Sequence, residues 1–396
     1  MTRISRSGSA DALPLALYVH TPWCVSKCPY CDFNSHAADQ PPFERYVSHL
    51  LADLDREVGS AVARRALRSV YIGGGTPSLF PEPAIRRLLD GIRARADLAS
   101  DVEITMEANP GKSEWRRLAA YREAGVNRLS IGAQSLSTVR LRALGRAHAA
   151  DDVRRTVQEA REAGFTNVNL DMMYALPDQS LGEAERDLAA LIDLGPEHIS
   201  YYQLTLEPNT GWRVHPPHLP DSDLAADMAE QGLEQLGRAG YRQYEVSAYA
   251  RDGLRCRHNL NYWEFGDYLG IGAGAHGKLT SEAGATGDRR RVRRTAKRHQ
   301  PRAYLSASPA ELTSSVRDLD EDDLVVEFAL NAFRLTEGFD RGLFSLTTGM
   351  PWARISTELG RAELDGMVRV LPDRVEPTAL GRRFVNELVG RFVAGG

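Results

Sequence analysis

Three of the four cysteines in this chain lie within eight positions, in the stretch CVSKCPYC at residues 24–31. The spacing C-x3-C-x2-C brings Cys24, Cys28 and Cys31 into one loop. Thiolates are the protein ligands of iron–sulfur clusters, and three thiolates on a cube of four irons leave one iron without a protein ligand. A substrate or cofactor can coordinate at that iron. The sequence therefore predicts a [4Fe–4S] site with one exchangeable position.

Other uses of these cysteines have to be compared with a cluster. A disulfide would leave one thiol unpaired, and disulfides are rare where thiols are kept reduced. A structural zinc site normally closes with four ligands, and His20 or His36 could supply the fourth. Three structural thiols that lie close together by chance are the remaining alternative. We predict the cluster and keep zinc as its alternative.

The composition is that of a soluble globular protein. The chain has 396 residues, of which 42% are hydrophobic and 26% charged, and its length suits two domains. The net charge of -4, from 49 basic and 53 acidic residues, disfavours a general nucleic-acid binder. No apolar run is long enough to cross a bilayer, and the first 14 residues hold no apolar signal core. These features predict a cytoplasmic protein with reduced thiols, and they leave peripheral membrane association open.

Apolar, β-rich runs alternate with helical patterns through the first 250 residues. The helical patterns include FERYVSHLLADLDREV and SEWRRLAAYREAG, which separate consecutive apolar runs. Alternation of strand and helix is typical of βα units that build a parallel sheet. We predict an α/β fold, an incomplete (β/α)6 TIM-like barrel with a small C-terminal winged-helix-like α+β domain. The six predicted strand segments are 15–20, 69–75, 101–110, 128–135, 167–177 and 198–208.

Polar residues end or follow each of these predicted strands. In barrels of βα units the working side chains lie at the carboxyl ends of the strands, which share one mouth. The glycines of GGGTP at 73–77 would let backbone amides approach a ligand closely, because glycine carries no side chain. The sequence thus predicts one site that combines the cysteine loop, GGGTPS, Glu107, Gln134, Asp171 and Gln203.

The loop CVSKCPYC resembles the cysteine loop of radical S-adenosylmethionine (SAM) enzymes, including Tyr30 before the last cysteine. In that family the open iron chelates the amino and carboxylate groups of SAM. An electron from the reduced cluster then cleaves the sulfonium and yields a 5′-deoxyadenosyl radical. The resemblance implies that GGGTP binds the amino group and that two tyrosines lie near the adenosine. The SAM contacts implied in this way are Tyr18, Tyr30, Gly74, Gly75, Thr76, Glu107, Gln134, Arg146 and Asp171.

Longer motifs resemble the coproporphyrinogen oxidase branch of this family, and within it the HemW-type haem chaperones. They include HTPWCVSKCPYCDFNSH, YIGGGTPS, RLSIGAQS, LGRAH, NLDMMYALP and HNLNYW. The oxygen-independent coproporphyrinogen III oxidase pattern has a further cysteine after the triad, where Phe33 stands here, and a longer amino-terminal segment. The resemblance implies a chaperone that binds haem and delivers it to apoproteins. Radical decarboxylation of coproporphyrinogen III to protoporphyrinogen IX is the enzymatic alternative, so whether the chain is an enzyme stays open.

The stretch CRHNLNYW at 256–263 is the second candidate site. A histidine beside aromatic residues can serve as an axial haem ligand. In HemW-like proteins the H-N-x-x-Y-W motif is associated with haem binding, so the resemblance implies His258 as the haem contact. From residue types alone, a structural His258 with Tyr262 and Trp263 in the core is the stronger interpretation. Cys256 is either a second soft haem ligand or a buried structural thiol.

The remaining sequence indicates the domain organisation and the partners. We predict a disordered amino terminus at 1–14, the barrel at 15–250, an HNxxYW segment with a basic linker at 251–309, and a C-terminal domain at 310–396. The basic run DRRRVRRTAKR at 288–298 is most simply a solvated loop, with haem propionates or anionic lipids as alternative contacts. The resemblance implies haem, recipient respiratory haemoproteins that include membrane-bound ones, and an electron donor as partners. No nucleic acid is expected as a partner.

Overall fold

The computed structural model describes residues 13–59, 65–111, 115–282 and 290–393. Seven parallel strands form the centre of the main sheet in these residues, and six of them are the strands predicted from the sequence. Helices connect the consecutive strands of the predicted set, as parallel pairing requires. In spatial order the seven are β11 (Asp267–Ile271), β1 (Leu15–Thr21), β4 (Leu67–Gly74), β5 (Leu98–Ala108), β6 (Arg128–Gln134), β7 (Val168–Tyr174) and β8 (His198–Gln203).

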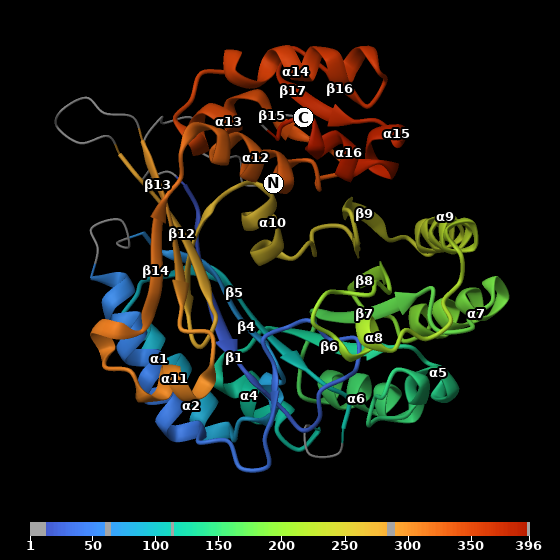
Figure 1. Ribbon diagram of the computed structural model, residues 1–396. Helices are drawn as coiled ribbons and strands as arrows, with labels where there is room; N and C mark the ends of the chain where they lie inside the picture. Colours follow the sequence, from blue (N-terminus) through green and yellow to red (C-terminus); the bar gives the residue numbers. More distant parts are fainter. Residues whose placement is uncertain (1–12, 60–64, 112–114, 283–289, 394–396) are drawn as a thin grey trace.

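Antiparallel strands flank the parallel set on both sides. Beyond β8 lie β10 (Ala248–Ala250) and β9 (Arg242–Glu245). Beyond β11 lie β12 (His276–Ser281), β13 (Arg291–Lys297) and β14 (Thr313–Asp318), which stand beside β1 in Figure 1. Because each end of the parallel set pairs with an antiparallel strand, the sheet of the described residues stays open. The predicted incomplete barrel is confirmed.

Helices pack along the outer face of the parallel strands (Figure 1). Their amphipathic patterns are the reason, since one face of each helix must be buried. In α1 (Phe43–Val58), for example, Tyr46, Leu50 and Leu54 recur at helical spacing and are buried. The other helical elements of this part are η3 (Pro77–Leu79), α2 (Glu82–Arg93), α4 (Leu118–Ala124), α5 (Thr138–Ala143), α6 (Ala150–Glu162), α7 (Leu181–Ile192), α8 (Gly211–Val214), α9 (Ser222–Arg238), α11 (Pro301–Ser306) and η4 (Pro309–Glu311).

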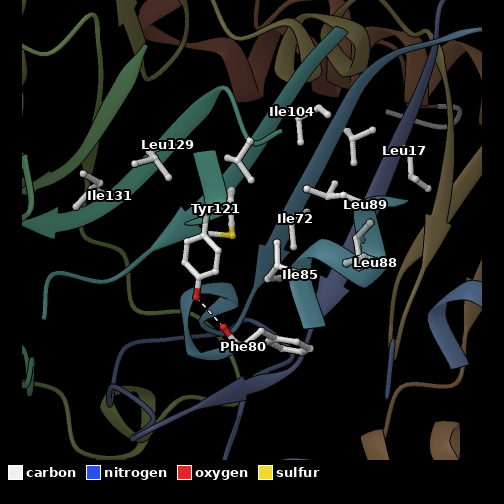
Figure 2. Packing of buried hydrophobic residues seen from close by; sticks show 14 of the residues in the cluster. Leu17, Ile72, Phe80, Ile85, Leu88, Leu89, Ile104, Tyr121, Leu129 and Ile131 are labelled. Carbon is white, nitrogen blue, oxygen red and sulfur yellow. Dashed lines mark hydrogen bonds between the residues drawn. The ribbon is translucent and has the colours of Figure 1, made fainter. Parts of the chain in front are cut away.

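The main hydrophobic core lies between the sheet and these helices (Figure 2). Ile72 of β4, Ile104 of β5 and Ile85 of α2 belong to one buried cluster. Tyr121 of α4 closes this core by donating a hydrogen bond from its hydroxyl to the carbonyl of Phe80 at 2.6 Å. Burial of each such large side chain contributes about 1.5–3 kcal/mol. The core fixes the strands, and the loops at their carboxyl ends are left to form the site.

The interpretation of 288–298 as a solvated loop is wrong for most of that run. Its first two residues lie outside the described part of the chain, and β13 spans most of the rest, paired with β12 and β14. Lys297 is buried and its Nζ lies 2.6 Å from Asp53 Oδ1, while Arg293 is exposed and its Nε bonds Asp318 at 2.8 Å. A strand that carries many charged residues thus has the composition of a solvated loop, and its pairing cannot be recognised from the sequence alone.

The carboxyl-terminal part of the chain forms a second, smaller core. It contains helices and a three-stranded sheet in the order β15-β17-β16, which agrees with the predicted α+β unit. Its winged-helix detail and the division of the chain at 250 and 310 stay predictions. The elements are α12 (Glu321–Ala332), β15 (Phe339–Asp340), α13 (Arg341–Thr348), α14 (Ala353–Leu364), β16 (Val368–Val370), β17 (Arg374–Pro377), α15 (Ala379–Arg383) and α16 (Val385–Gly390).

The helix α10 (Arg257–Trp263) carries the HNxxYW motif and packs against β1, β4 and α12. Glu103 of β5 accepts hydrogen bonds from the N–H groups of Arg257 and His258, at 3.0 and 3.3 Å. At the other end of the helix, the guanidinium of Arg334 lies 4.3 Å from the Trp263 ring centroid. The motif therefore lies near the amino-terminal ends of the strands, opposite the cysteine loop that follows β1.

Candidate functional site

The cysteine loop is closed by a parallel pair of two short strands, β2 (Trp23–Cys24) and β3 (His36–Ala37). Within the loop the N–H of Cys31 donates to the carbonyl of Cys28 at 3.1 Å. All three cysteines are free thiols of intermediate exposure. The loop thus presents three sulfurs at the carboxyl end of β1, where the sequence predicts the site.

A chain of hydrogen bonds through three other residues joins Cys24 to Cys28. Thr76 Oγ1 donates to Cys24 Sγ at 3.5 Å and accepts from Asn109 Nδ2 at 2.8 Å. Asn109 Oδ1 accepts from Arg146 Nη2 at 2.6 Å, and Arg146 Nη1 donates to Cys28 Sγ at 3.7 Å. Burial raises the pKa of Cys24, while the hydrogen bond from Thr76 acts in the opposite direction and favours the thiolate, the form that binds iron.

These groups fit an iron–sulfur cube better than a single metal ion. Among the described residues, no three His, Cys, Asp or Glu side chains are grouped so that they could hold one ion. An iron–sulfur cube does not need three side chains directed at one ion, because each thiolate binds a different iron. His20, a possible fourth zinc ligand, has both ring nitrogens in hydrogen bonds, to Tyr18 at 3.0 Å and to Asn34 at 2.9 Å. Arg146 keeps a buried Nε without a partner in the described structure, available to a ligand.

The glycines at the end of β4 cross close to the end of β1. Gly74 has a φ of +115°, and a Cβ at Gly74 or Gly75 would lie 2.5 Å from an atom of the segment 20–23. The Gly74 N–H donates to Glu107 Oε2 at 3.0 Å, and the Gly75 N–H donates to the carbonyl of Thr21 at 2.6 Å. The glycines therefore permit close packing of two strand ends, and these two amides already have partners within the protein.

Glu107, near the end of β5, is a partly buried carboxyl of the mouth. Its Oε1 accepts a hydrogen bond from the Tyr71 hydroxyl at 2.8 Å, and its Oε2 accepts from the Gly74 N–H at 3.0 Å. Burial raises the pKa of Glu107 to about 7, although the hydrogen bond from Tyr71 acts in the opposite direction. A carboxyl with this pKa is partly ionised near neutral pH and can attract the ammonium group of a ligand.

Gln134 and Asp171 lie on the adjacent strands β6 and β7. Gln134 has a φ of +64°, and its Oε1 accepts from the Tyr202 hydroxyl at 2.9 Å. Asp171 accepts from Asn169 Nδ2 at 2.7 Å and from Ser130 Oγ at 3.3 Å, and burial raises the pKa of Asp171. Neighbouring strands therefore fix both predicted SAM contacts.

The two predicted adenosine contacts are partly buried tyrosines. Tyr18 shares a hydrogen bond with His20, and the Tyr30 ring centroid lies 5.6 Å from that of Trp212 in α8. Gln203 is exposed at the end of β8, unlike the other polar residues that the sequence places at the strand ends. The structure thus gathers the predicted contacts along the barrel and leaves Gln203 at its rim.

His258 is only 2% exposed, at the end of the barrel opposite the cysteines. Its Nδ1 is hydrogen-bonded to Ser69 Oγ at 3.0 Å and its Nε2 to the Tyr262 hydroxyl at 3.1 Å. Burial lowers the pKa of His258 to about 3. Cys256 beside it is fully buried. Haem ligation by His258 stays a prediction, and it requires the ring to leave Ser69 or Tyr262.

Asn109, Tyr71 and Asn34 belong to the site although the sequence analysis did not single them out. Asn109 links Thr76 to Arg146, and Tyr71 holds Glu107. Two of these residues could have been found from their positions in the sequence. Asn109 directly follows β5, and Asn34 closely follows the last cluster cysteine. Tyr71 gave no local signal, because an aromatic residue within an apolar strand is ordinarily a core residue.

Two protein-family models match the chain. Residues 18–191 match the radical SAM superfamily, and residues 319–384 match the HemN C-terminal domain. A protein of Escherichia coli (strain K12) named heme chaperone HemW is 49% identical over 96% of this chain and 98% of its own length. The chain belongs to the HemW family. A second HemW protein, from Haemophilus influenzae, is 44% identical over 96% of this chain and 98% of its own length.

A solved structure adds a comparison of fold for this HemW-family chain. Coproporphyrinogen III oxidase (HemN) from Escherichia coli superposes with a TM-score of 0.80 and 22% identity, covering 99% of this chain and 92% of that one. At this identity the likeness shows the fold alone. The radical SAM match establishes a [4Fe–4S] cluster and SAM as cofactors, and the residues assigned to each cofactor stay predictions. In the described part of the chain, no helix has the length and apolar character to cross a membrane.

Proposed function

We propose that this chain binds haem and delivers it to apoproteins. One observation carries the proposal: the relative named heme chaperone HemW is 49% identical and aligns over 96% of this chain. The proposed recipients are haemoproteins of the respiratory chain, membrane-bound ones included, and an electron donor reduces the cluster. We place this activity in the cytoplasm, with contact to the membrane surface where the recipient lies in the membrane.

The residues of the mouth hold the two cofactors in this proposal. We assign the cluster to Cys24, Cys28 and Cys31, with Thr76 and Arg146 donating hydrogen bonds to sulfur. When bound, the reduced cluster supplies the electron that cleaves the sulfonium of SAM. Glu107 attracts the ammonium group of SAM in its ionised form. The assigned SAM contacts are Tyr18, Tyr30, Gly74, Gly75, Thr76, Glu107, Gln134, Arg146 and Asp171.

Radical decarboxylation of coproporphyrinogen III is the second candidate function. The hydrogen-bonded chain from Cys24 to Cys28 favours it, because the groups that radical chemistry needs are present and connected. Phe33 argues against it, since this side chain is 60% exposed where the oxidase pattern has a further cysteine. We therefore rank the chaperone first.

Transfer of haem to an acceptor tests the chaperone proposal. The chain is purified without oxygen, loaded with haem, freed of excess haem and mixed with a haem-free acceptor whose absorption reports uptake. We expect uptake that requires the chain, and failure to bind haem would contradict the proposal. A parallel incubation with coproporphyrinogen III, a reductant and SAM should give no protoporphyrinogen IX, and its formation would favour the oxidase.

The predicted haem contact His258 is tested separately by titration. Haem is added to the wild-type chain and to His258→Ala, and the two affinities are compared. Weaker binding by the variant supports His258 as a contact. Equal and specific binding by both proteins removes His258 from the proposal and leaves the chaperone function intact.

A further inference from the structure

Three histidines gather around Asn34, which follows Cys31 by three positions. His20 Nε2 is hydrogen-bonded to the Asn34 carbonyl at 2.9 Å, and His36 Nε2 to Asn34 Oδ1 at 2.8 Å. Asn34 Nδ2 donates to the carbonyl of His299 at 2.8 Å. One amide side chain therefore ties the cluster loop to the segment that directly follows β13.

His276 joins this group from the neighbouring strand. It begins β12 and pairs with Ala296 of β13, three positions before His299. Partial burial lowers the pKa of His276, and the charges of Arg294 and His299 lower it further. His299 also contributes, after burial, to the lowered pKa of His20 and of His36. A Cβ placed on Gly274 would lie 2.4 Å from Asn34 Nδ2 and 3.5 Å from His299 Cδ2, so the ring of His299 lies beside Asn34.

The rings of His276 and His299 are open to ligands. Both residues are exposed, and within the described structure neither ring nitrogen has a hydrogen-bond partner. Haem iron binds a neutral imidazole nitrogen, and these rings can provide one without breaking a contact. The ring of His258 differs, because it is buried with both nitrogens engaged.

The adjoining cluster loop adds apolar side chains and a cation. Val25 is 68% exposed and Phe33 is 60% exposed. Lys27 Nζ donates to the carbonyl of Phe33 at 3.0 Å, and its charge helps to lower the pKa of His36. Exposed apolar side chains suit the plane of a porphyrin, and an ammonium group suits its propionates. The surface therefore offers a partner for each chemical part of haem.

We propose that haem docks on this histidine face, defined as Val25, Lys27, Phe33, His36, His276 and His299. The exposed pair His276 and His299 supplies the axial imidazole, and Lys27 pairs with a propionate. The assignment rests on the proposed haem-chaperone function and locates its substrate. Haem then lies beside the cluster loop, while the buried His258 lies at the opposite end of the barrel.

Haem titration of the full chain tests this location. The double variant His276→Ala/His299→Ala is compared with wild type, with His258→Ala and with the control His218→Ala, whose exposed ring pairs with Asp178 at 2.7 Å. We expect the double variant to lose about tenfold or more in affinity and the absorption signature of imidazole ligation. The control should keep both. His276→Gln/His299→Gln repeats the test with a different polar side chain, in case the alanine variant folds poorly.

The outcomes separate this inference from the function on which it rests. If the wild-type chain fails to bind haem, the chaperone proposal itself is overturned. If wild type binds and the double variant binds equally well, the histidine face is wrong and the chaperone function stands. Loss of binding in His258→Ala alone would likewise move haem to the other end of the barrel. Iron and sulfide content, measured for every variant, verifies that the cluster has been retained.

Discussion

The imidazole of His258 stacks on the ring of Tyr71, with centroids 4.9 Å apart and planes inclined by 27°. The Tyr71 hydroxyl donates a hydrogen bond to Glu107 at 2.8 Å, and Glu107 accepts a second hydrogen bond from the N–H of Gly74. The HNxxYW helix is thereby connected through the barrel interior to the glycines beside the cysteine loop. A change in this helix should therefore affect the cofactor mouth.

Binding of SAM should depend on the ionisation of Glu107. Burial raises the pKa of Glu107 to about 7, and only the ionised carboxylate attracts the SAM ammonium group. Affinity should therefore rise as the pH increases from about 6 to about 8. Glu107→Gln should bind SAM more weakly at the upper end of this range and lose the pH dependence, as calorimetric titration can show. Unchanged binding by this variant would remove Glu107 from the site.

Tyr71→Phe provides a second test of the same carboxyl. The hydrogen bond from Tyr71 lowers the pKa of Glu107, so its removal should move the rise in SAM affinity to higher pH. The aromatic ring and its stacking on His258 are retained in this variant. A pH profile identical to that of wild type would show that the Tyr71 hydroxyl does not control Glu107.

Stability in acid should depend on His258. Burial lowers the pKa of His258 to about 3 in the folded chain, whereas an unfolded histidine titrates near about 6.5. Between these values the unfolded state binds one more proton, so this group removes about 1.4 kcal/mol of stability per pH unit as the pH falls. His258→Gln should reduce the slope of unfolding free energy against pH by this amount. Urea unfolding at several pH values measures the slope, and His218→Ala serves as the exposed control.

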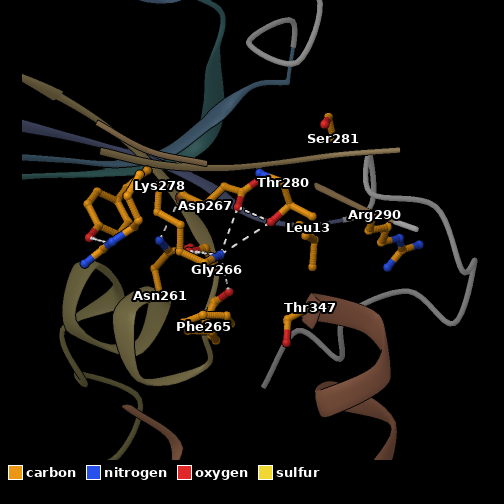
Figure 3. Close-up of polar contacts among 12 residues, drawn as sticks. Leu13, Asn261, Phe265, Gly266, Asp267, Lys278, Thr280, Ser281, Arg290 and Thr347 are labelled. Atoms are coloured by element: carbon orange, nitrogen blue, oxygen red, sulfur yellow. Dashed lines mark hydrogen bonds and ion pairs between the residues drawn. The ribbon is translucent and has the colours of Figure 1, made fainter. Parts of the chain in front are cut away.

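The buried ion group around Asp267 should be necessary for stability. Asp267 accepts a hydrogen bond from Lys278 Nζ at 3.1 Å and another from the Thr280 hydroxyl (Figure 3). It also accepts from Arg65 Nη2 at 2.7 Å. Asp267→Ala would leave two cations without their shared carboxylate. Loss of one partner from such a buried pair costs about 3–5 kcal/mol.

Denaturant unfolding measures this loss, with an exposed ion pair as the matched control. Glu44→Ala breaks the pair with Arg87, whose two side chains are 64% and 44% exposed, and it should change stability little. If Asp267→Ala is as stable as the Glu44→Ala control, the Asp267 group makes no special contribution to the fold.

The strands and the cysteine triad could be predicted because their signals are local. Each of the six apolar runs became a strand, and the spacing of Cys24, Cys28 and Cys31 placed them in one loop. The extension β12–β14 was missed because the basic residues of β13 look solvated, although Lys297 is buried against Asp53. That pairing joins distant parts of the chain, so no local pattern can show it.

The environment of the HNxxYW motif also could not be predicted from local sequence patterns. Ser69 lies 189 positions from His258, yet it occupies one ring nitrogen. The residue types suggested either a haem ligand or a structural histidine, and the burial that distinguishes them arises only when α10 packs on β4. The exposed imidazoles of His276 and His299 were not singled out, because exposure is a property of the fold.

Serine substitutions test which of the four cysteines bind the cluster. Cys24→Ser, Cys28→Ser and Cys31→Ser should each lose most of the iron that wild type takes up in anaerobic reconstitution. Cys256→Ser should retain it, because this thiol is fully buried and lies 3.6 Å from Glu103, away from the loop. Iron and sulfide analysis measures the outcome. Equal iron loss in Cys256→Ser would contradict the assignment.

The central claim is that three thiolates hold a [4Fe–4S] cluster whose remaining iron is open to SAM. Electron paramagnetic resonance of the reduced, anaerobically prepared chain, recorded before and after addition of SAM, tests it most directly. The account predicts a cluster signal that SAM changes, with about four irons and four sulfides per chain. A colourless protein without sulfide, or a cluster signal that SAM leaves unaltered, would contradict it.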